Sequence, residues 1–204
     1  MIYEGKQTPR LAAKIAVVVA KFNRTITERL LKGALDKFQE LGVEQDMVDV
    51  FYVPGAFEIP MVISRLLETQ LYEGFLALGA VIKGETSHDE HINRAVSLQL
   101  SKLSCDSQVP VMYGVLTCNT VEQAIARSGG DPGSHDKTKA AHLGNKGADC
   151  AEGLLEMMDL IGQIDQIENE WDDAVWGSGV GGGFLDDNGE EMDGSDFETD
   201  SEAE

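Results

Sequence analysis

One segment of the chain combines residue types that bind anions with a residue type that transfers protons: Gly84-Glu85-Thr86-Ser87-His88. It follows the apolar run Phe75 to Ile82, whose length and continuity predict a strand buried on both faces of a parallel sheet. Ser87 and Glu90 have the spacing of a capping box, so a helix is expected to begin there. His88 then lies in the first turn of that helix.

The chemistry expected at this turn is proton transfer beside a bound phosphate. Free backbone N–H groups and the positive end of the helix dipole attract an anion, and the same field disfavours an imidazolium. A neutral His88 imidazole is therefore available as a base near pH 7. Alternatively, the strand, the turn and an exposed histidine serve only the fold, because many α/β proteins contain such a unit.

Strands and helices are expected to alternate along the chain. Apolar runs predict strands at 15–20, 47–53, 75–82 and 111–117. Helices are expected from a capping box at Thr25 and Glu28, from near Glu58 with Pro60 in the first turn, from Ser87, from a box at Thr120 and Gln123 to Arg127, and over 153–164. Such repeated units favour a parallel sheet covered by helices on both sides.

Ligands of open parallel sheets bind beyond the carboxyl ends of the strands. Two aromatic residues, Phe22 and Phe57, follow the first two strands and have the shape to stack on a planar heterocycle. Glu58 has the chemistry to accept hydrogen bonds from ring N–H groups. Each residue also has a purely structural interpretation, since aromatic residues pack at strand ends and a carboxylate favours a helix N-terminus.

The charge of the chain is concentrated near its C-terminus. The formal net charge is −20, but 15 of the 36 acidic side chains lie from Asp165 onward, where Lys and Arg are absent. Residues 1–164 therefore hold 21 acidic and 16 basic side chains, a net charge of −5. This part has the length of one domain and no basic footprint for nucleic acid.

Cysteines and apolar segments bear on the cellular compartment. Cys105, Cys118 and Cys150 are odd in number and widely spaced, which argues against a disulfide framework or a thiolate zinc site and favours buried thiols. The apolar run Ile15 to Ala20 is too short for a signal peptide, and no run reaches the length of a membrane span. A cytoplasmic protein is expected.

Several motifs in sequence order together resemble one enzyme family. They are Phe22-Asn23, Pro54-Gly55-Ala56-Phe57-Glu58-Ile59-Pro60, Gly79 to His88, Tyr113-Gly114-Val115-Leu116-Thr117, Glu122-Gln123-Ala124 with Arg127, and Gly144-Asn145-Lys146-Gly147. In combination, over residues 1 to about 164, they are similar to 6,7-dimethyl-8-ribityllumazine synthases.

The resemblance implies a fold, a reaction and an assembly. The fold would be a flavodoxin-like α/β three-layer sandwich with a four-stranded parallel sheet. The reaction would join 5-amino-6-(D-ribitylamino)uracil to 3,4-dihydroxy-2-butanone 4-phosphate with loss of phosphate and water, the penultimate step of riboflavin synthesis, without metal or organic cofactor. The assembly would be a homo-oligomer, a pentamer or a 60-subunit icosahedral shell, with active sites between subunits.

The resemblance also implies roles for individual residues. His88 would be the general acid/base, and Phe22 would stack on the pyrimidine. The polar edge and the ribityl chain would bind Ala56, Phe57, Glu58, Ala80, Val81 and Ile82. Glu85 and Thr86 would hold the phosphate, Arg127 would clamp it, and Lys146 is a further candidate beside it. Tyr113, where the family commonly has Phe, would come from the neighbouring subunit.

The chain departs from the family in two segments. Residues 128–139 form a longer connection than is usual in the family, and their lysines are expected to be solvated. Residues 165–204 are expected to be a disordered acidic tail beside the catalytic domain 1–164. Aromatic residues in this tail, Trp171, Trp176, Phe184 and Phe197, leave open either a solubilising role or docking to a protein partner.

Three other functions compete with the synthase. A metal hydrolase is suggested by His88 and His91, but the i, i+3 spacing is not the i, i+4 pair of the helical zinc motif. A nucleotide or flavin module is suggested by the sheet, but the chain has neither G-x-G-x-x-G nor a Walker loop at a strand end. A cage that recruits cargo through the tail is compatible with catalysis and stays open.

Overall fold

The computed structural model describes residues 1–9, 13–130 and 144–176. The elements, in chain order, are β1 (Ile15–Ala20), α1 (Arg24–Glu40), the 3₁₀ turn η1 (Gln45–Met47), β2 (Val48–Val53), the 3₁₀ turn η2 (Ala56–Glu58), α2 (Ile59–Leu67), β3 (Gly74–Ile82), α3 (His88–Ser107), β4 (Val111–Cys118), α4 (Val121–Arg127) and α5 (Lys146–Trp176). Strands and helices alternate as the sequence predicts.

The four strands form one parallel sheet in the order β2-β1-β3-β4. This order places β1 and β3 in the centre, which explains their continuous apolar sequences. All six residues of β1 are buried, and so are the residues of β3 from Gly74 to Val81. The expected flavodoxin-like α/β three-layer fold is confirmed.

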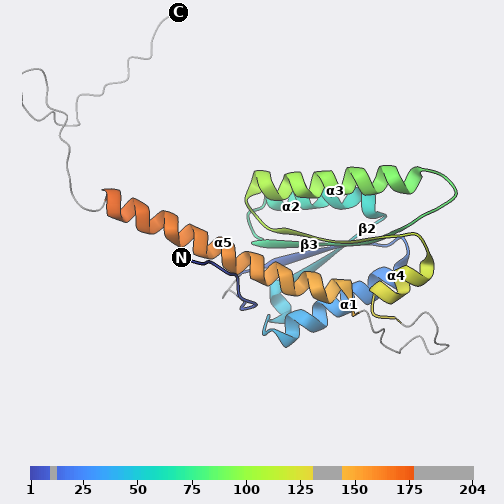
Figure 1. The fold of residues 1–204 in the computed structure, drawn as a ribbon, viewed down its shortest axis with the longest axis horizontal. Coiled ribbons are helices and arrows are strands. Elements are labelled where there is room, and N and C mark those ends of the chain that lie inside the picture. Colours follow the sequence, from blue (N-terminus) through green and yellow to red (C-terminus); the bar gives the residue numbers. More distant parts are fainter. Residues whose placement is uncertain (10–12, 131–143, 177–204) are drawn as a thin grey trace, which may run out of the picture. The chain divides into compact units, whose positions relative to one another are not determined.

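Two apolar layers enclose the sheet. One face packs against α1, α4 and the first part of α5 through Leu30, Ala124 and Leu154, all fully buried. The opposite face packs against α2 and α3 through side chains such as Ile63 and Leu100. Figure 1 shows α2 and α3 on one side of the sheet, with α1 and α4 on the other.

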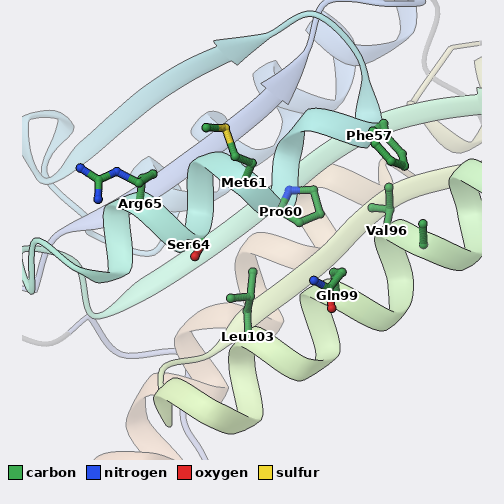
Figure 2. A pocket seen from close by; sticks show the side chains of 9 residues that line it. Phe57, Pro60, Met61, Ser64, Arg65, Val96, Gln99 and Leu103 are labelled. Carbon is green, nitrogen blue, oxygen red and sulfur yellow. The ribbon is translucent and has the colours of Figure 1, made fainter.

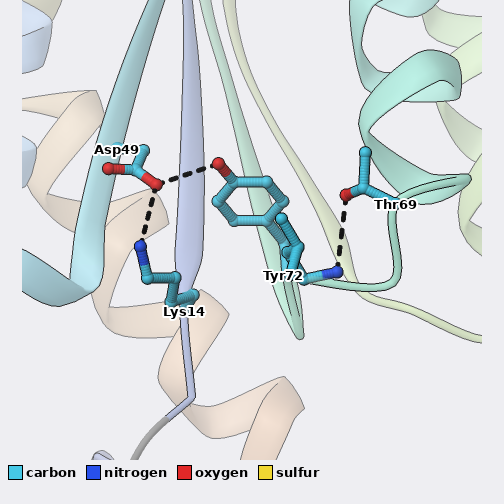
Figure 3. Close-up of polar contacts among 5 residues, drawn as sticks. Lys14, Asp49, Thr69 and Tyr72 are labelled. Atoms are coloured by element: carbon cyan, nitrogen blue, oxygen red, sulfur yellow. Dashed lines mark hydrogen bonds and ion pairs between the residues drawn. The ribbon is translucent and has the colours of Figure 1, made fainter.

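A polar cluster lies at the amino ends of the strands, opposite to the predicted site. Lys14 directly precedes β1, Asp49 belongs to β2, and Tyr72 shortly precedes β3. The Tyr72 hydroxyl donates to Asp49 Oδ2 at 2.9 Å, and Lys14 Nζ donates to the same oxygen at 3.3 Å (Figure 3). The cluster therefore connects three strand starts through one carboxylate.

Two of the three predicted capping boxes are wrong. Helix α1 begins at Arg24, directly after Asn23, so Thr25 and Glu28 lie inside it. Ser87 does precede α3, but it makes no side-chain capping hydrogen bond, and its carbonyl accepts from Glu90 N–H at 3.1 Å instead. The box at α4 is confirmed in part, since Thr120 Oγ1 accepts from Gln123 N–H at 3.3 Å. Gln123 Oε1 in turn accepts from Asn119 N–H at 2.8 Å.

The cysteine expectation is correct for only one residue. Cys150 is buried, Cys118 is half-buried, and Cys105 is exposed on α3. Cys105 is exposed because the apolar face of α3 is made by Val96 and Leu100, which lie on a different side of that helix.

The last helix extends beyond both predicted ends. Expected over 153–164, α5 runs from Lys146 to Trp176 and so includes the first residues of the predicted acidic tail. Ile164, Ile167 and Trp171 continue the helical spacing there, and the Trp171 side chain is 68% exposed. The remainder of the tail, 177–204, and most of the 128–139 connection lie outside the described residues.

Candidate active site

A cavity of about 580 Å³ opens at the carboxyl ends of β1, β2 and β3. It is lined by Phe22, Pro54, Gly55, Ala56, Phe57, Glu58, Ala80, Val81, Ile82, Gly84, Thr86, His88, Asp89, His91 and Ile92. Nine of the residues predicted from the sequence are in this lining. They meet because the carboxyl ends of parallel strands lie at one edge of the sheet.

Two exposed aromatic side chains stand at the cavity. Phe22 is 71% exposed and Phe57 is 60% exposed, although both are large apolar residues. The backbone at Phe22 is fixed, since Phe22 N–H donates to Pro54 O at 3.1 Å and Lys21 N–H donates to Val53 O at 2.8 Å. Aromatic faces held at the wall of a cavity have the geometry to stack on a planar ring.

The carboxylate of Glu58 is held by its own loop. Glu58 Oε2 accepts a hydrogen bond from Gly55 N–H at 2.8 Å, within the turn that carries the chain from β2 to α2. Pro60 follows in the first turn of α2, where its missing N–H costs nothing. A carboxylate fixed in this way still has lone pairs with which to accept from a ligand.

His88 is the first residue of α3, and its side chain is exposed at the cavity. Its backbone N–H donates to Thr86 Oγ1 at 3.5 Å, which keeps the Thr86 hydroxyl beside the helix start. The sequence interpretation missed three further lining residues of this helix: Asp89, His91 and Ile92. The last two lie three and four positions after His88, so helical spacing alone could have found them.

Arg127 and Lys146 line a different cavity, of about 700 Å³, beyond the carboxyl end of β4. The Arg127 side chain is exposed, and within the described ranges no carboxylate is paired with it. Lys146 Nζ lies 3.8 Å from Asp149 Oδ2. Burial raises the pKa of the Cys118 thiol in this cavity, and the charge of Arg127 opposes that rise. The cavity therefore offers two cations to an anion.

Tyr113 and Glu85 line neither cavity. Tyr113 lies in β4 opposite Ala77 of β3 and packs against the core layer under α2 and α3. Its burial raises the pKa of its phenol. Glu85 is exposed in the loop between β3 and α3. One chain thus brings the predicted pyrimidine residues together with Thr86 and His88, but not with Tyr113, Glu85, Arg127 or Lys146.

A third hollow adjoins the first cavity. It measures about 370 Å³ and lies between α2 and α3, where Phe57 belongs to both linings. Figure 2 shows Pro60 and Ser64 of α2 on the side toward Val96, Gln99 and Leu103 of α3, whereas the Met61 and Arg65 side chains extend away from α3 in this view. The Met61 side chain is 69% exposed. An apolar groove thus continues from the site along the helices.

No group of three or more His, Cys, Asp or Glu side chains is arranged to hold a metal ion within the described parts of the chain. Across the same residues, none of the helices is both long and apolar enough to cross a membrane.

The sheet order and the position of the cavity place the chain in a broad structural class. The chain has the parallel sheet order 2-1-3-4 of a flavodoxin-like α/β protein, with a cavity at the carboxyl ends of the strands that is lined by two aromatic residues and an imidazole. The model of one family, described as 6,7-dimethyl-8-ribityllumazine synthase, matches residues 12–162. The chain belongs to this family, which implies a transferase-type enzyme with lumazine synthase activity in riboflavin biosynthesis.

Proposed function

We propose that this protein condenses 5-amino-6-(D-ribitylamino)uracil with 3,4-dihydroxy-2-butanone 4-phosphate to give 6,7-dimethyl-8-ribityllumazine, phosphate and water. The observation that carries the proposal is the shared cavity of Phe22, Glu58 and His88 in a chain of the lumazine synthase family. It supplies a stacking surface, a hydrogen-bond acceptor and a proton carrier within one space. The family match supports this chemistry over other uses of the same fold.

The pyrimidine is proposed to bind between the aromatic wall and the end of β3. Phe22 stacks on the ring, and the backbone of Ala80, Val81 and Ile82 bonds its polar edge. Ala56, Phe57 and Glu58 receive the ribityl chain, whose hydroxyl groups suit a fixed carboxylate and free backbone groups. Both segments lie at strand ends, so they form a rigid wall for this substrate.

The phosphate is proposed to lie at the start of α3. The Thr86 hydroxyl and the backbone amide groups at the start of α3 provide hydrogen-bond donors for the phosphate oxygens. Glu85, in the same loop, is proposed to lie beside the phosphate as well. Arg127 adds a planar fork of donors that binds phosphate oxygens in pairs, with Lys146 as a second cation. Fixed donors stabilise the charge that develops as phosphate leaves.

His88 is proposed to move the protons of the reaction. Schiff-base formation takes a proton from the attacking amine and gives one to the leaving oxygen, and ring closure makes the same demand. An imidazole serves both directions near neutral pH. Its place in the cavity that holds the proposed pyrimidine wall brings it to the reacting nitrogen. In this proposal no step needs a metal or an organic cofactor.

The complete site is proposed to lie between two subunits. His88 and Arg127 line separate cavities in one chain, and these two cavities share no lining residue within the described part of the chain. A neighbouring subunit that contributes Arg127, Lys146 and Tyr113 would close the first cavity. The resemblance to the family implies active sites between subunits and a Tyr113 from the neighbouring subunit, and we extend this arrangement to Arg127 and Lys146. The exposed apolar groove beside Phe57 supports an assembled state, because it adjoins the open side of the site. The assembly is a pentamer or a 60-subunit shell.

The test of this function is a turnover assay with both purified substrates. The protein is mixed with the pyrimidine and the butanone phosphate, lumazine is followed by its absorbance, and phosphate release is measured in parallel. We expect lumazine and phosphate to form together, at a rate above the uncatalysed mixture and unchanged by a chelator. A protein that assembles but gives only the uncatalysed rate would exclude the enzyme and favour the cage.

A further inference from the structure

Strand β3 extends further than its neighbour β1 at the edge that carries the site. The pairing of β1 with β3 ends at Val19 and Leu78, whereas the pairing of β3 with β4 continues to Ile82 and Cys118. From Gly79 onward, β3 is thus held by a strand on one side only. This free side belongs to the segment of β3 that lines the cavity.

A side chain replaces the missing strand at this position. Asn23 Nδ2 donates to Ala80 O at 2.9 Å, across 57 residues of sequence. The backbone of Asn23 is left-handed, with φ 58° and ψ 42°, a conformation that asparagine adopts more readily than most residues. β1 ends three residues earlier, at Ala20, and the left-handed Asn23 directly precedes α1 while its side chain is bonded to β3.

The same residue also fixes the start of α1. Its carbonyl oxygen accepts from Ile26 N–H at 2.8 Å and from Thr27 N–H at 3.2 Å. Phe22, the residue before it, is bonded through its own N–H to Pro54 O at 3.1 Å. The Phe22 ring is 71% exposed, so packing against the protein does little to orient it. Its direction depends on the backbone, and Asn23 ties that backbone to β3.

We propose that Asn23 is a positioning residue for the pyrimidine: its amide fixes the separation between the Phe22 ring and the Ala80–Ile82 edge of β3. These two surfaces are the proposed stacking face and the proposed hydrogen-bonding edge for one planar substrate, so the inference rests on the proposed function. A change in their separation weakens the binding of the ring but leaves the cations of the phosphate side in place.

Two substitutions distinguish the role of the Asn23 side-chain hydrogen bond from the role of its backbone conformation. Asn23→Gly keeps access to the left-handed conformation and removes the donor. Asn23→Asp keeps the size of the side chain and replaces the donor with a carboxylate that faces the Ala80 carbonyl. The matched control is Gln108→Gly, since Gln108 is also left-handed, with φ 59°, at the other end of α3 and outside the cavity lining.

The measurements are the Kd of the pyrimidine alone, by calorimetry, and the KM of each substrate. We expect Asn23→Gly to raise the Kd and KM for the pyrimidine about 3- to 10-fold, the usual effect of one neutral hydrogen bond. The KM for the butanone phosphate should change less than about twofold. Asn23→Asp should have the larger effect of the two, and Gln108→Gly should leave both constants unchanged.

The inference would be overturned by an unchanged pyrimidine Kd in both Asn23 variants, or by an equal rise in the KM values of the two substrates. Loss of cooperative melting in both Asn23 variants would also overturn it, because Asn23 would then be needed for the fold alone. Failure of the proposed function gives a different result. In that case the wild-type protein forms no lumazine, while the calorimetric comparison still reports whether Asn23 positions a bound pyrimidine.

Discussion

His88 and Arg127 are assigned different parts of the reaction, and each assignment predicts a different kinetic defect. In the proposal, the His88 imidazole carries protons within the cavity of Phe22 and Glu58, whereas the Arg127 guanidinium binds phosphate from the cavity beyond β4. Loss of a proton carrier slows the chemical step, and loss of a binding cation weakens one substrate. The two variants therefore distinguish catalysis from binding.

Replacing His88 by Gln should lower kcat about 10²- to 10⁴-fold, the usual contribution of general acid/base catalysis. Gln keeps the polarity and much of the size of the side chain, so the assembly should persist. Steady-state turnover and size-exclusion chromatography measure the two effects. Glu90→Gln is the matched control, because Glu90 lies in the same first turn but outside the cavity lining. An unchanged kcat in a well-assembled His88→Gln protein would remove the assignment.

Replacing Arg127 by Ala should raise the KM for the butanone phosphate at least about tenfold, because a bidentate charged hydrogen bond is lost. The KM for the pyrimidine should change much less. Initial rates with each substrate varied in turn give both constants. Lys32→Ala serves as a charge-matched control, since Lys32 is an exposed residue of α1 paired with Asp36. Equal rises in both KM values would contradict the phosphate role.

At the scale of elements, the cluster at the amino ends of the strands predicts a pH-dependent stability. Burial, followed by the hydrogen bond to Asp49, raises the pKa of Tyr72 from 10.0 to about 12. The protonated phenol is thus favoured in the folded state. The stabilisation that the protonated Tyr72 phenol gives the folded state is fully present below about pH 10, where the phenol is protonated in the folded and the unfolded state. It is lost as the pH rises toward about 12.

Replacing Tyr72 by Phe should lower the free energy of unfolding by about 1 kcal/mol at neutral pH, because the hydrogen bond to Asp49 is lost. This effect is smaller than that of losing a buried hydrogen bond to a charged group, because the Asp49 side chain is 40% exposed. The difference from the wild-type protein should shrink between about pH 10 and 12. Urea titrations at several pH values measure it, with Tyr3→Phe as a control on the exposed N-terminal segment. A difference that stays constant through this range would show that the hydroxyl bond is not the source.

Much of the element order could be predicted from the sequence because the strands are buried on both faces. Apolar runs set β1 and β3 with at most one residue of error, since central strands of a parallel sheet tolerate few polar residues. Helix starts were less predictable. The boxes at Thr25 and Ser87 failed because spacing alone does not show that a side chain reaches a backbone group.

The candidate site was predictable up to the limit of one chain. Phe22, Phe57, Glu58 and His88 could be expected together, because each follows a strand of one parallel sheet. The hydrogen bond from Asn23 to Ala80 could not be expected, since it depends on β3 running past β1. The place of Arg127 in a separate cavity could not be predicted either, because spacing along the sequence does not show which strand ends share a cavity.

At the scale of the whole molecule, two features remain predictions of the sequence. One is a cytoplasmic location. The other is the role of the acidic segment from Asp165, which carries 15 acidic residues without Lys or Arg and for which a solubilising role and docking to a protein partner both stay open. Helix α5 continues into this segment, and its Trp171 side chain is 68% exposed. Trp171 therefore has the exposure that a docking residue requires.

The proposed assembly rests on the separation of the two cavities. A ring in which each subunit presents its β4 edge to the open cavity of the next would join His88 of one chain to Arg127 of its neighbour. Each site would then require two chains, and an isolated chain would hold two incomplete halves.

Mixed assemblies test this account most directly. His88→Gln and Arg127→Ala proteins are unfolded together, refolded as a mixture and assayed for lumazine formation. The butanone phosphate is kept well below its raised KM in Arg127→Ala, so that each variant alone has low activity. If the site spans two chains, about a quarter of the sites in a random equal mixture combine an intact His88 with an intact Arg127, and activity returns to that level. A mixture that assembles but is no more active than its two components would contradict the shared site.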